Sequence, residues 1–301
     1  MPSPNRWLRE PSLADPTGGL GVVVLGLGSA IAWGASDFGG GWTGRRSPVF
    51  GVALVVDGLG VLLMVALALV IREPVPGTTT LGLAILAGIL SVAGIVGLYQ
   101  GLAVGRMGVV APVTGLLAAS IPVVVGFVGQ GLPAPEVVIG IAFALVAVIL
   151  VSRSHDPEGR PSGIEYGIVG GIGLGLFNIA VGAFPEDLVA WPLALIKLAA
   201  LVTIALLVLG TRRPWRVPRP VLPAVLAVGV VDLVGNGLYV LATQAGRLDI
   251  AAALSSLYPV TTVILAVAIL HERVTRSHLV GIVMAAVAIV LIAGGSVSPG
   301  V

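Results

Sequence analysis

The sequence predicts an all-α integral membrane protein with ten transmembrane helices, arranged as two inverted five-helix repeats. Charged residues make up 10% of the 301 residues and hydrophobic residues 57%, with a mean hydropathy of +1.09, whereas about a quarter of an ordinary soluble domain is charged. The charges gather between apolar runs of about 18 or more residues, the length that crosses a hydrocarbon core of about 30 Å. Because backbone groups in lipid must be satisfied internally, runs this long form helices rather than barrel strands.

Ten apolar runs are separated by polar breaks that are rich in proline, glycine and arginine, such as Arg-Glu-Pro-Val-Pro-Gly at 72–77. The expected spans are roughly 19–38, 48–71, 79–103, 108–129, 135–152, 163–183, 188–209, 220–243, 249–270 and 277–294. Four prolines within spans predict helix kinks: Pro112, Pro122, Pro192 and Pro259.

The longest break divides the chain into two units of five spans. We expect a polar tail at 1–18, a first unit at 19–152, a linker at 153–162, a second unit at 163–294 and a short tail at 295–301. Adding 141 to the numbers of 105–151 superposes this stretch on the end of the second unit, with Gly105-Arg106 on Gly246-Arg247. A unit with an odd number of spans re-enters the membrane from the opposite side when it is repeated. The pattern therefore predicts an inverted repeat, which is typical of secondary transporters with a substrate site near the midplane.

Several classes of chemistry are excluded or disfavoured by composition. The chain has no cysteine, which excludes disulfides and thiolate metal sites. His155, His271 and His278 lack metal-ligand spacing, and no Walker loop, dinucleotide fingerprint or nucleophile elbow is present. We therefore expect no cofactor, no metal and no catalytic residue. The loop arginines indicate anionic lipid head groups rather than nucleic acid as neighbours.

The arginines also bear on orientation. Four lie on the side of the termini: Arg6, Arg9, Arg72 and Arg247. Eleven lie on the other side: Arg45, Arg46, Arg106, Arg153, Arg160, Arg212, Arg213, Arg216, Arg219, Arg273 and Arg276. The positive-inside rule thus favours both termini outside the cytoplasm.

Two charges inside predicted spans are the strongest candidates for a substrate site. Lys197 is the only lysine, about 12 Å into the seventh span, and Asp57 lies at a similar depth in the second span. The two positions are 140 residues apart, so an inverted repeat places them at symmetry-equivalent positions measured from opposite faces. We predict that they pair across the central axis or both line the cavity. The alternative is a purely structural ion pair, although charges in membrane spans are functional candidates by default.

A polar stripe marks the eighth span, where Asp232, Asn236 and Tyr239 lie at i, i+4 and i+7 and share one helical face. Such a stripe either lines a cavity or makes interhelical hydrogen bonds. Asp232 is also a candidate proton carrier.

Four further residues are weaker candidates for substrate binding. Tyr99 and Gln100 lie opposite Tyr239 in the repeat, and Trp33 and Asn178 occupy matching places in the first span of each unit. Trp33 is either a cavity wall for apolar or aromatic substrates or a packing residue near the membrane interface. Asp37 is expected to be a solvated residue at the end of its span.

The run ALSSLYPVTTVILAVAILHERVTRSHLVGIVMAAVAIVLIAGG resembles the C-terminal part of an EamA domain of the drug/metabolite transporter superfamily. Its hinge is Leu270-His271-Glu272-Arg273, with His in place of the family's usual Gly, and Trp33-Gly34 in the first span is also similar to the family. The resemblance implies two EamA units, a central cavity lined by the first four helices of each, and export or exchange of small metabolites or drugs. It also implies cytoplasmic termini, against the arginine count. Reporter fusions at Val301 decide between the two orientations.

The resulting hypothesis is a secondary transporter, not an enzyme, that moves a small-molecule solute by alternating access between the two repeats. With no ATPase domain, the energy would come from a coupling proton, another ion or a solute gradient, or the protein would be a uniporter. We expect a multi-pass protein of a cell membrane of the bacterial inner-membrane type, in contact with membrane lipids, as a monomer or weak homodimer. The alternatives are a flippase for lipids or lipid-linked sugars and a membrane-embedded lipid-modifying enzyme.

Overall fold

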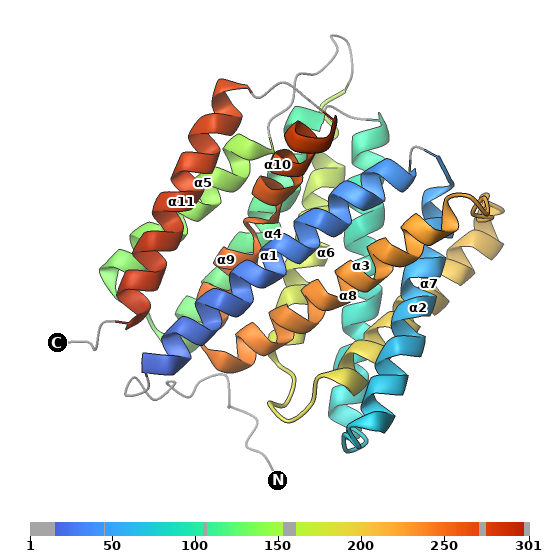
Figure 1. Cartoon of the computed structure of the whole chain (residues 1–301), viewed down its shortest axis with the longest axis horizontal. Coiled ribbons are helices and arrows are strands. Elements are labelled where there is room, and N and C mark those ends of the chain that lie inside the picture. Colours follow the sequence, from blue (N-terminus) through green and yellow to red (C-terminus); the bar gives the residue numbers. More distant parts are fainter. Residues whose placement is uncertain (1–15, 45, 105–106, 153–160, 271–274, 298–301) are drawn as a thin grey trace.

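The computed structural model describes residues 16–44, 46–104, 107–152, 161–270 and 275–297, and every regular element in them is an α-helix (Figure 1). The helices are α1 (Pro16–Gly44), α2 (Val49–Val70), α3 (Thr78–Val104), α4 (Met107–Gln130), α5 (Pro135–Val151), α6 (Ile164–Gly182), α7 (Ala190–Thr211), α8 (Leu222–Ala245), α9 (Leu248–Ser255), α10 (Tyr258–Leu270) and α11 (Arg276–Val297).

The predicted all-helical membrane fold is confirmed. Nine segments of the described chain are long and apolar enough to cross a membrane, and α5, with 17 residues, is a shorter apolar helix beside them. Helices α9 and α10 together make one of the nine spans, Leu248–Ile269. Many large apolar side chains of the bundle are exposed. On α2, for example, Leu62 is 70% exposed, Leu69 64% and Val70 79%. Such a surface suits lipid and not water.

The ninth span is broken at Ser256 and Leu257, just before Pro259. A proline inside a helix removes one backbone hydrogen bond and clashes with the preceding turn, so this break agrees with the kink that the sequence predicts. Pro192, by contrast, is the third residue of α7. In the first turn of a helix its missing N–H has no intrahelical partner to lose.

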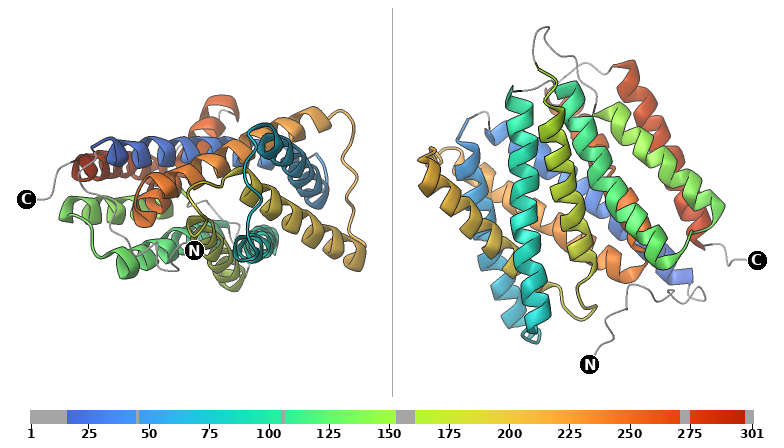
Figure 2. Two further views of the ribbon diagram at one scale, coloured as in Figure 1. Left: turned by 90° about the horizontal axis from the view of Figure 1, so that it is seen from below. Right: turned by 180° about the vertical axis from the view of Figure 1, so that it is seen from behind.

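The principal helix pairs join the first half of the chain to the second. α1 packs on α8, α2 on α7, α3 on α6 and α5 on α11, and α6 also packs on α4. In Figure 2 the α5–α11 pair lies at one side of the bundle and α2 with α7 at the other. The chain enters α1 and leaves α11 at the same end of the bundle (Figure 1), as an even number of spans requires.

Glycines allow α3 and α6 to touch through their backbones. A Cβ added to Gly97 would lie 2.9 Å from the amide nitrogen of Gly170, and one added to Gly173 would lie 2.7 Å from that of Gly94. These distances leave no room for a side chain. Small residues at helix interfaces serve this close approach in membranes, where apolar burial gives no net drive to pair helices.

Candidate functional site

An ionic triad joins α2, α7 and α8 inside the bundle. Nζ of Lys197 on α7 lies 3.1 Å from Oδ1 of Asp57 on α2 and 2.6 Å from Oδ2 of Asp232 on α8. The lysine and Asp57 are buried, and Asp232 is partly buried. The predicted pairing of Asp57 with Lys197 is therefore present, and the structure adds a second carboxylate that the sequence placed only on the polar stripe of its own helix.

The triad lies well inside the membrane-spanning part of the bundle. Lys197 is seven residues from the start of α7 and Asp57 eight from the start of α2, about 10–12 Å along each helix at 1.5 Å per residue. The two helices run in opposite directions, so these depths are counted from opposite faces. A lysine stem is long enough to close the remaining difference in height.

Gly60 of α2 leaves room for the aliphatic part of the Lys197 side chain. A Cβ at Gly60 of α2 would lie 2.9 Å from Cγ and 3.1 Å from Cδ of Lys197. Because Gly60, one turn after Asp57, has no side chain, the lysine side chain has space to reach the carboxylate. A larger residue there would displace the ammonium group.

Asn236 holds Asp232 in place. Its Nδ2 donates to the backbone oxygen of Asp232 at 2.8 Å and to Oδ2 at 3.1 Å. The same carboxylate oxygen thus accepts from Lys197 and from Asn236, one turn further along α8. Within the polar stripe of α8, Asn236 therefore hydrogen-bonds to the triad.

Asp37 of α1 faces the same region. Its side chain is exposed, yet it lies close enough to Asp232 to interact with it electrostatically. The sequence analysis placed Asp37 at the end of the first span, expected at 19–38. In the structure α1 continues to Gly44, and Asp37 lies about two turns inside it. A third carboxylate therefore accompanies the triad on an accessible surface.

Trp33, Tyr239 and Asn178 form a second cluster, in the core. The Trp33 and Tyr239 rings have centroids 5.2 Å apart, and the Tyr239 hydroxyl donates to the backbone oxygen of Asn178 at 3.4 Å. Nδ2 of Asn178 donates to the backbone oxygen of Ala118 on α4. Tyr239 is 1% exposed. These three residues pack together, apart from the ionic contacts of the triad.

Two candidates from the sequence remain, Tyr99 and Gln100, both near the end of α3. Gln100 is exposed near the end of α3, and the side chain of Tyr99 lies outside the described part of the structure. Residues His271, Glu272 and Arg273 of the family-like hinge also lie outside the described residues.

Glu73, which the sequence gave no role, fastens one end of the α2–α7 pair. Its carboxylate accepts hydrogen bonds from the backbone N–H groups of Val189 (2.8 Å), Ala190 (3.0 Å) and Trp191 (2.6 Å). The indole Nε1 of Trp191 donates to the backbone oxygen of Glu73 at 3.1 Å. The sequence signal for this cap was the start of α7 itself, where Val189 offers no side-chain oxygen to the orphan N–H groups of the first turn.

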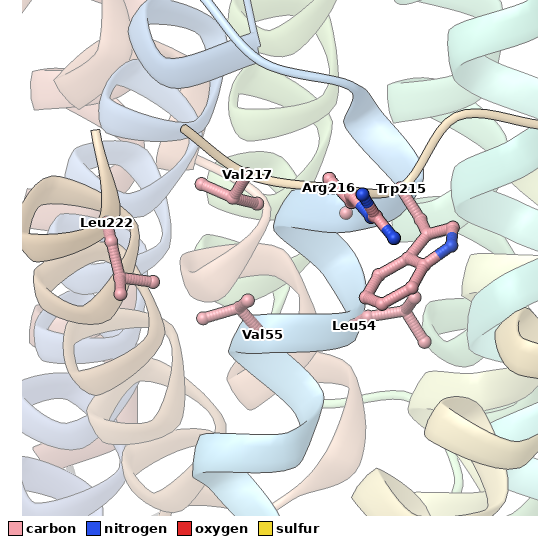
Figure 3. Close-up of a pocket in the computed structure, with 7 residues that line it drawn as sticks. Leu54, Val55, Trp215, Arg216, Val217 and Leu222 are labelled. Carbon is pink, nitrogen blue, oxygen red and sulfur yellow. The ribbon is translucent and has the colours of Figure 1, made fainter. Parts of the chain in front are cut away.

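The other end of the α2–α7 pair is packed differently. The α7–α8 loop lies against the start of α2, where a Cβ at Gly51 would collide with the backbone oxygen of Trp215. Beside this contact is a cavity of about 400 Å³ lined by Gly51, Leu54, Val55, Trp215, Arg216, Val217 and Leu222. Figure 3 shows these residues coming from α2, the loop and the start of α8.

Two further polar ties lie at the Glu73 end of the bundle. Nε2 of Gln244, near the end of α8, donates to the backbone oxygens of Pro185 and Leu188 in the α6–α7 loop. Arg247 binds the buried carboxylate of Asp249 and donates to the backbone oxygen of Gln130, the last residue of α4. Loops from both halves of the chain are thus held together at this end.

Intramembrane charges that hold three helices together within a multi-pass helical bundle are typical of transport proteins. Comparison with known proteins gives the class. The EamA-like transporter family model matches residues 161–294. One solved crystal structure is 17% identical, with a TM-score of 0.72 over 90% of this chain and 95% of that chain, and this likeness establishes the fold. No curated protein sequence matches the chain.

The protein is accordingly a multi-pass membrane transporter. The part of the chain at 161–294 is similar to the EamA-like transporters.

Proposed function

We propose that the protein is a secondary transporter that exports or exchanges a small metabolite or drug, with the Asp57–Lys197–Asp232 triad as the centre of its transport site. The observation that carries this proposal is the charge of the triad. Two carboxylates share one ammonium group, so the triad holds one excess negative charge when all three groups are ionised. Asp37 adds a third carboxyl group nearby. An excess charge within the membrane is unfavourable unless a cation balances it.

That excess charge supports coupling to a cation. A proton, a metal cation or the cationic group of a substrate at Asp232 or Asp37 would restore neutrality. Lys197 is already neutralised by its two partners. The site therefore suits a cationic or amine-bearing solute better than an anion, and a zwitterion only where its carboxylate displaces Asp232 from the lysine.

In this proposal alternating access takes place between two inverted repeats, and the packing of the helices supports that arrangement. Exchanging α1 with α6, α2 with α7, α3 with α8 and α5 with α11 turns the α1–α8 contact into the α6–α3 contact. It returns the α2–α7 and α5–α11 contacts to themselves.

The backbone supplies a second sign of the repeat. In the described chain, Arg72 and Arg212 are the two residues other than glycine with positive φ, at 55° and 52°. They are 140 residues apart, the same offset as Asp57 and Lys197, and each lies within two residues of the end of a helix of the α2–α7 pair. Few non-glycine residues adopt this conformation, so its repetition at matching positions supports a shared ancestry of the two units.

In this proposal the two units, 19–152 and 163–294, rock about the triad. The bonds of Glu73 to the start of α7 and the ties of Gln244 and Arg247 close one end of the bundle. Opening that end requires them to break. We also propose that the protein resides in a cell membrane of the bacterial inner-membrane type, as a monomer or weak homodimer.

An uptake screen in proteoliposomes tests the proposal. Purified protein is reconstituted, a pH gradient is imposed, and uptake of amino acids, nucleosides and cationic dyes is compared between the wild type and Asp232→Asn. We expect a cationic or amine-bearing solute to be accumulated by the wild type and not by the variant. Glu165→Gln, which changes an exposed acid in the first turn of α6, is the matched control and keeps full activity. Equal accumulation by the wild type and Asp232→Asn would refute the role of the triad.

A further inference from the structure

The cavity beside Gly51 lies where two membrane spans meet the interface. The α7 span ends at Thr211, the α8 span begins at Leu222, and the α2 span begins at Val49. Leu54 and Val55 of the cavity wall are five and six residues inside α2, about 8–9 Å along the helix. The cavity thus extends from the interface into the hydrocarbon depth of the bundle.

The rim of this cavity is strongly basic. The α7–α8 loop, 212–220, contains four arginines and no acidic residue: Arg212, Arg213, Arg216 and Arg219. All four are exposed, and none of them forms an ion pair with a carboxylate of the described chain. Arg216 also lines the cavity itself. Four unpaired positive charges in nine residues leave this loop in need of anionic partners.

Trp215 connects the basic rim to the apolar wall. Its side chain is 52% exposed, and the guanidinium carbon of Arg216 lies 5.9 Å from the centre of its ring. Figure 3 shows the indole beside Leu54 and the Arg216 side chain above it. A half-exposed tryptophan at the end of a span is characteristic of the level of lipid head groups.

We propose that this cavity binds an anionic phospholipid, with acyl chain carbons against Leu54, Val55 and Leu222 and the phosphate at Arg216. The cavity requires both parts of an amphiphile at once. A soluble anion would leave the apolar wall at hydrocarbon depth uncovered, and a neutral lipid would leave the arginines unpaired. At about 400 Å³ the cavity is within the size range of small-molecule sites. The bound lipid would hold the α7–α8 loop against the start of α2.

Fluorescence quenching by brominated lipids tests this proposal on the purified full-length protein in detergent. Dibrominated phosphatidylglycerol and dibrominated phosphatidylcholine are titrated separately, and the signal of Trp215→Phe is subtracted to isolate Trp215. We expect phosphatidylglycerol to quench Trp215 at a several-fold lower mole fraction than phosphatidylcholine. Arg216→Gln should weaken this preference roughly fivefold, the effect of one interfacial basic residue. Arg276→Gln, an exposed arginine at the start of α11 on the same side of the bundle, should leave the preference unchanged.

Two outcomes would overturn the proposal. Equal quenching by the two lipids would mean that the arginines do not select the head group. Relief of the quenching by glycerol 3-phosphate, at the concentration of the lipid, would mean that the loop binds a soluble anion and that the apolar wall contributes nothing. We expect glycerol 3-phosphate to have no effect.

Discussion

The two ends of the α2–α7 helix pair occupy matching positions and are built from opposite chemistry. At one end Glu73, just after left-handed Arg72, accepts three backbone N–H groups at the start of α7. At the other end the residue after left-handed Arg212 is Arg213. A guanidinium group has donors and no acceptor, so it cannot cap the start of α2, and that end is held by the packing of Trp215 on Gly51.

This difference indicates that the two ends resist opening to different degrees. Hydrogen bonds from helix N–H groups to a carboxylate are directional and charge-assisted, so the Glu73 end separates only when several bonds break together. Packing of the Trp215 backbone on Gly51, beside a cavity, gives way more gradually. The ionic triad lies between the two ends.

Removing the lysine of the triad should have the largest effect of any change to the pair. Lys197→Met leaves the buried Asp57 and the partly buried Asp232 without a cation. Breaking a buried ion pair in this way destabilises a protein by about 3–5 kcal/mol. Thermal unfolding of the purified protein in detergent measures it. Adding Asp57→Asn and Asp232→Asn should restore most of the loss. A Lys197→Met variant as stable as the wild type would show that the triad is not an ion pair in the folded protein.

Reversing the charge at the capped end should have the next largest effect. Glu73→Arg makes this end resemble the other and leaves three N–H groups of α7 without their acceptor, at a cost of about 2 kcal/mol. The unfolding midpoint should fall and amide hydrogen exchange at Trp191 should accelerate. Glu136→Gln, an exposed acid in the first turn of α5, should change neither.

Introducing an acid at the other end, where the α7–α8 loop meets the start of α2, should stabilise that end. Arg213→Glu supplies a carboxylate near the first turn of α2, a gain of about 0.5–1 kcal/mol if it caps those N–H groups. The expected result is a higher unfolding midpoint together with slower turnover, because both ends would then be fastened. A variant with unchanged stability would show that the two ends are not equivalent in backbone geometry.

The smallest effect is expected for Arg216→Gln. Its side chain is exposed and unpaired within the described protein, so the unfolding free energy in lipid-free detergent should change by less than about 0.5 kcal/mol. In phosphatidylglycerol the same change should reduce the stabilisation that the lipid gives. A large loss of stability without lipid would assign Arg216 to the fold instead.

Much of the fold could be predicted from hydropathy, because each span must satisfy its own backbone and must be long enough to cross the membrane. The 140-residue offset between Asp57 and Lys197 was enough to predict that they pair. The break between α9 and α10 was signalled by Pro259. The end of α1 was not predicted, since glycines at 39–41 read as a loop when only local propensity is considered.

The rest of the site depends on contacts between distant segments. Asp232 shared a helical face with Asn236 in the sequence, but nothing there placed that face on Lys197. Glu73 lay in a proline-rich break that served only as a boundary, and its partner residues are 116–118 positions away. Such a cap can be identified only from the three-dimensional structure, in which the two loops are in contact.

The most direct test of the triad's role is uptake by the neutral variant Asp57→Asn/Lys197→Met/Asp232→Asn. Replacing a buried ionic cluster by neutral groups often leaves stability unchanged or raises it, so this variant should unfold at or near the wild-type temperature. In proteoliposomes with an imposed pH gradient, the predicted result is a folded protein whose uptake of the transported solute is at background. Uptake by the neutral variant at the wild-type rate would show that the triad is not needed for transport and has only a structural role.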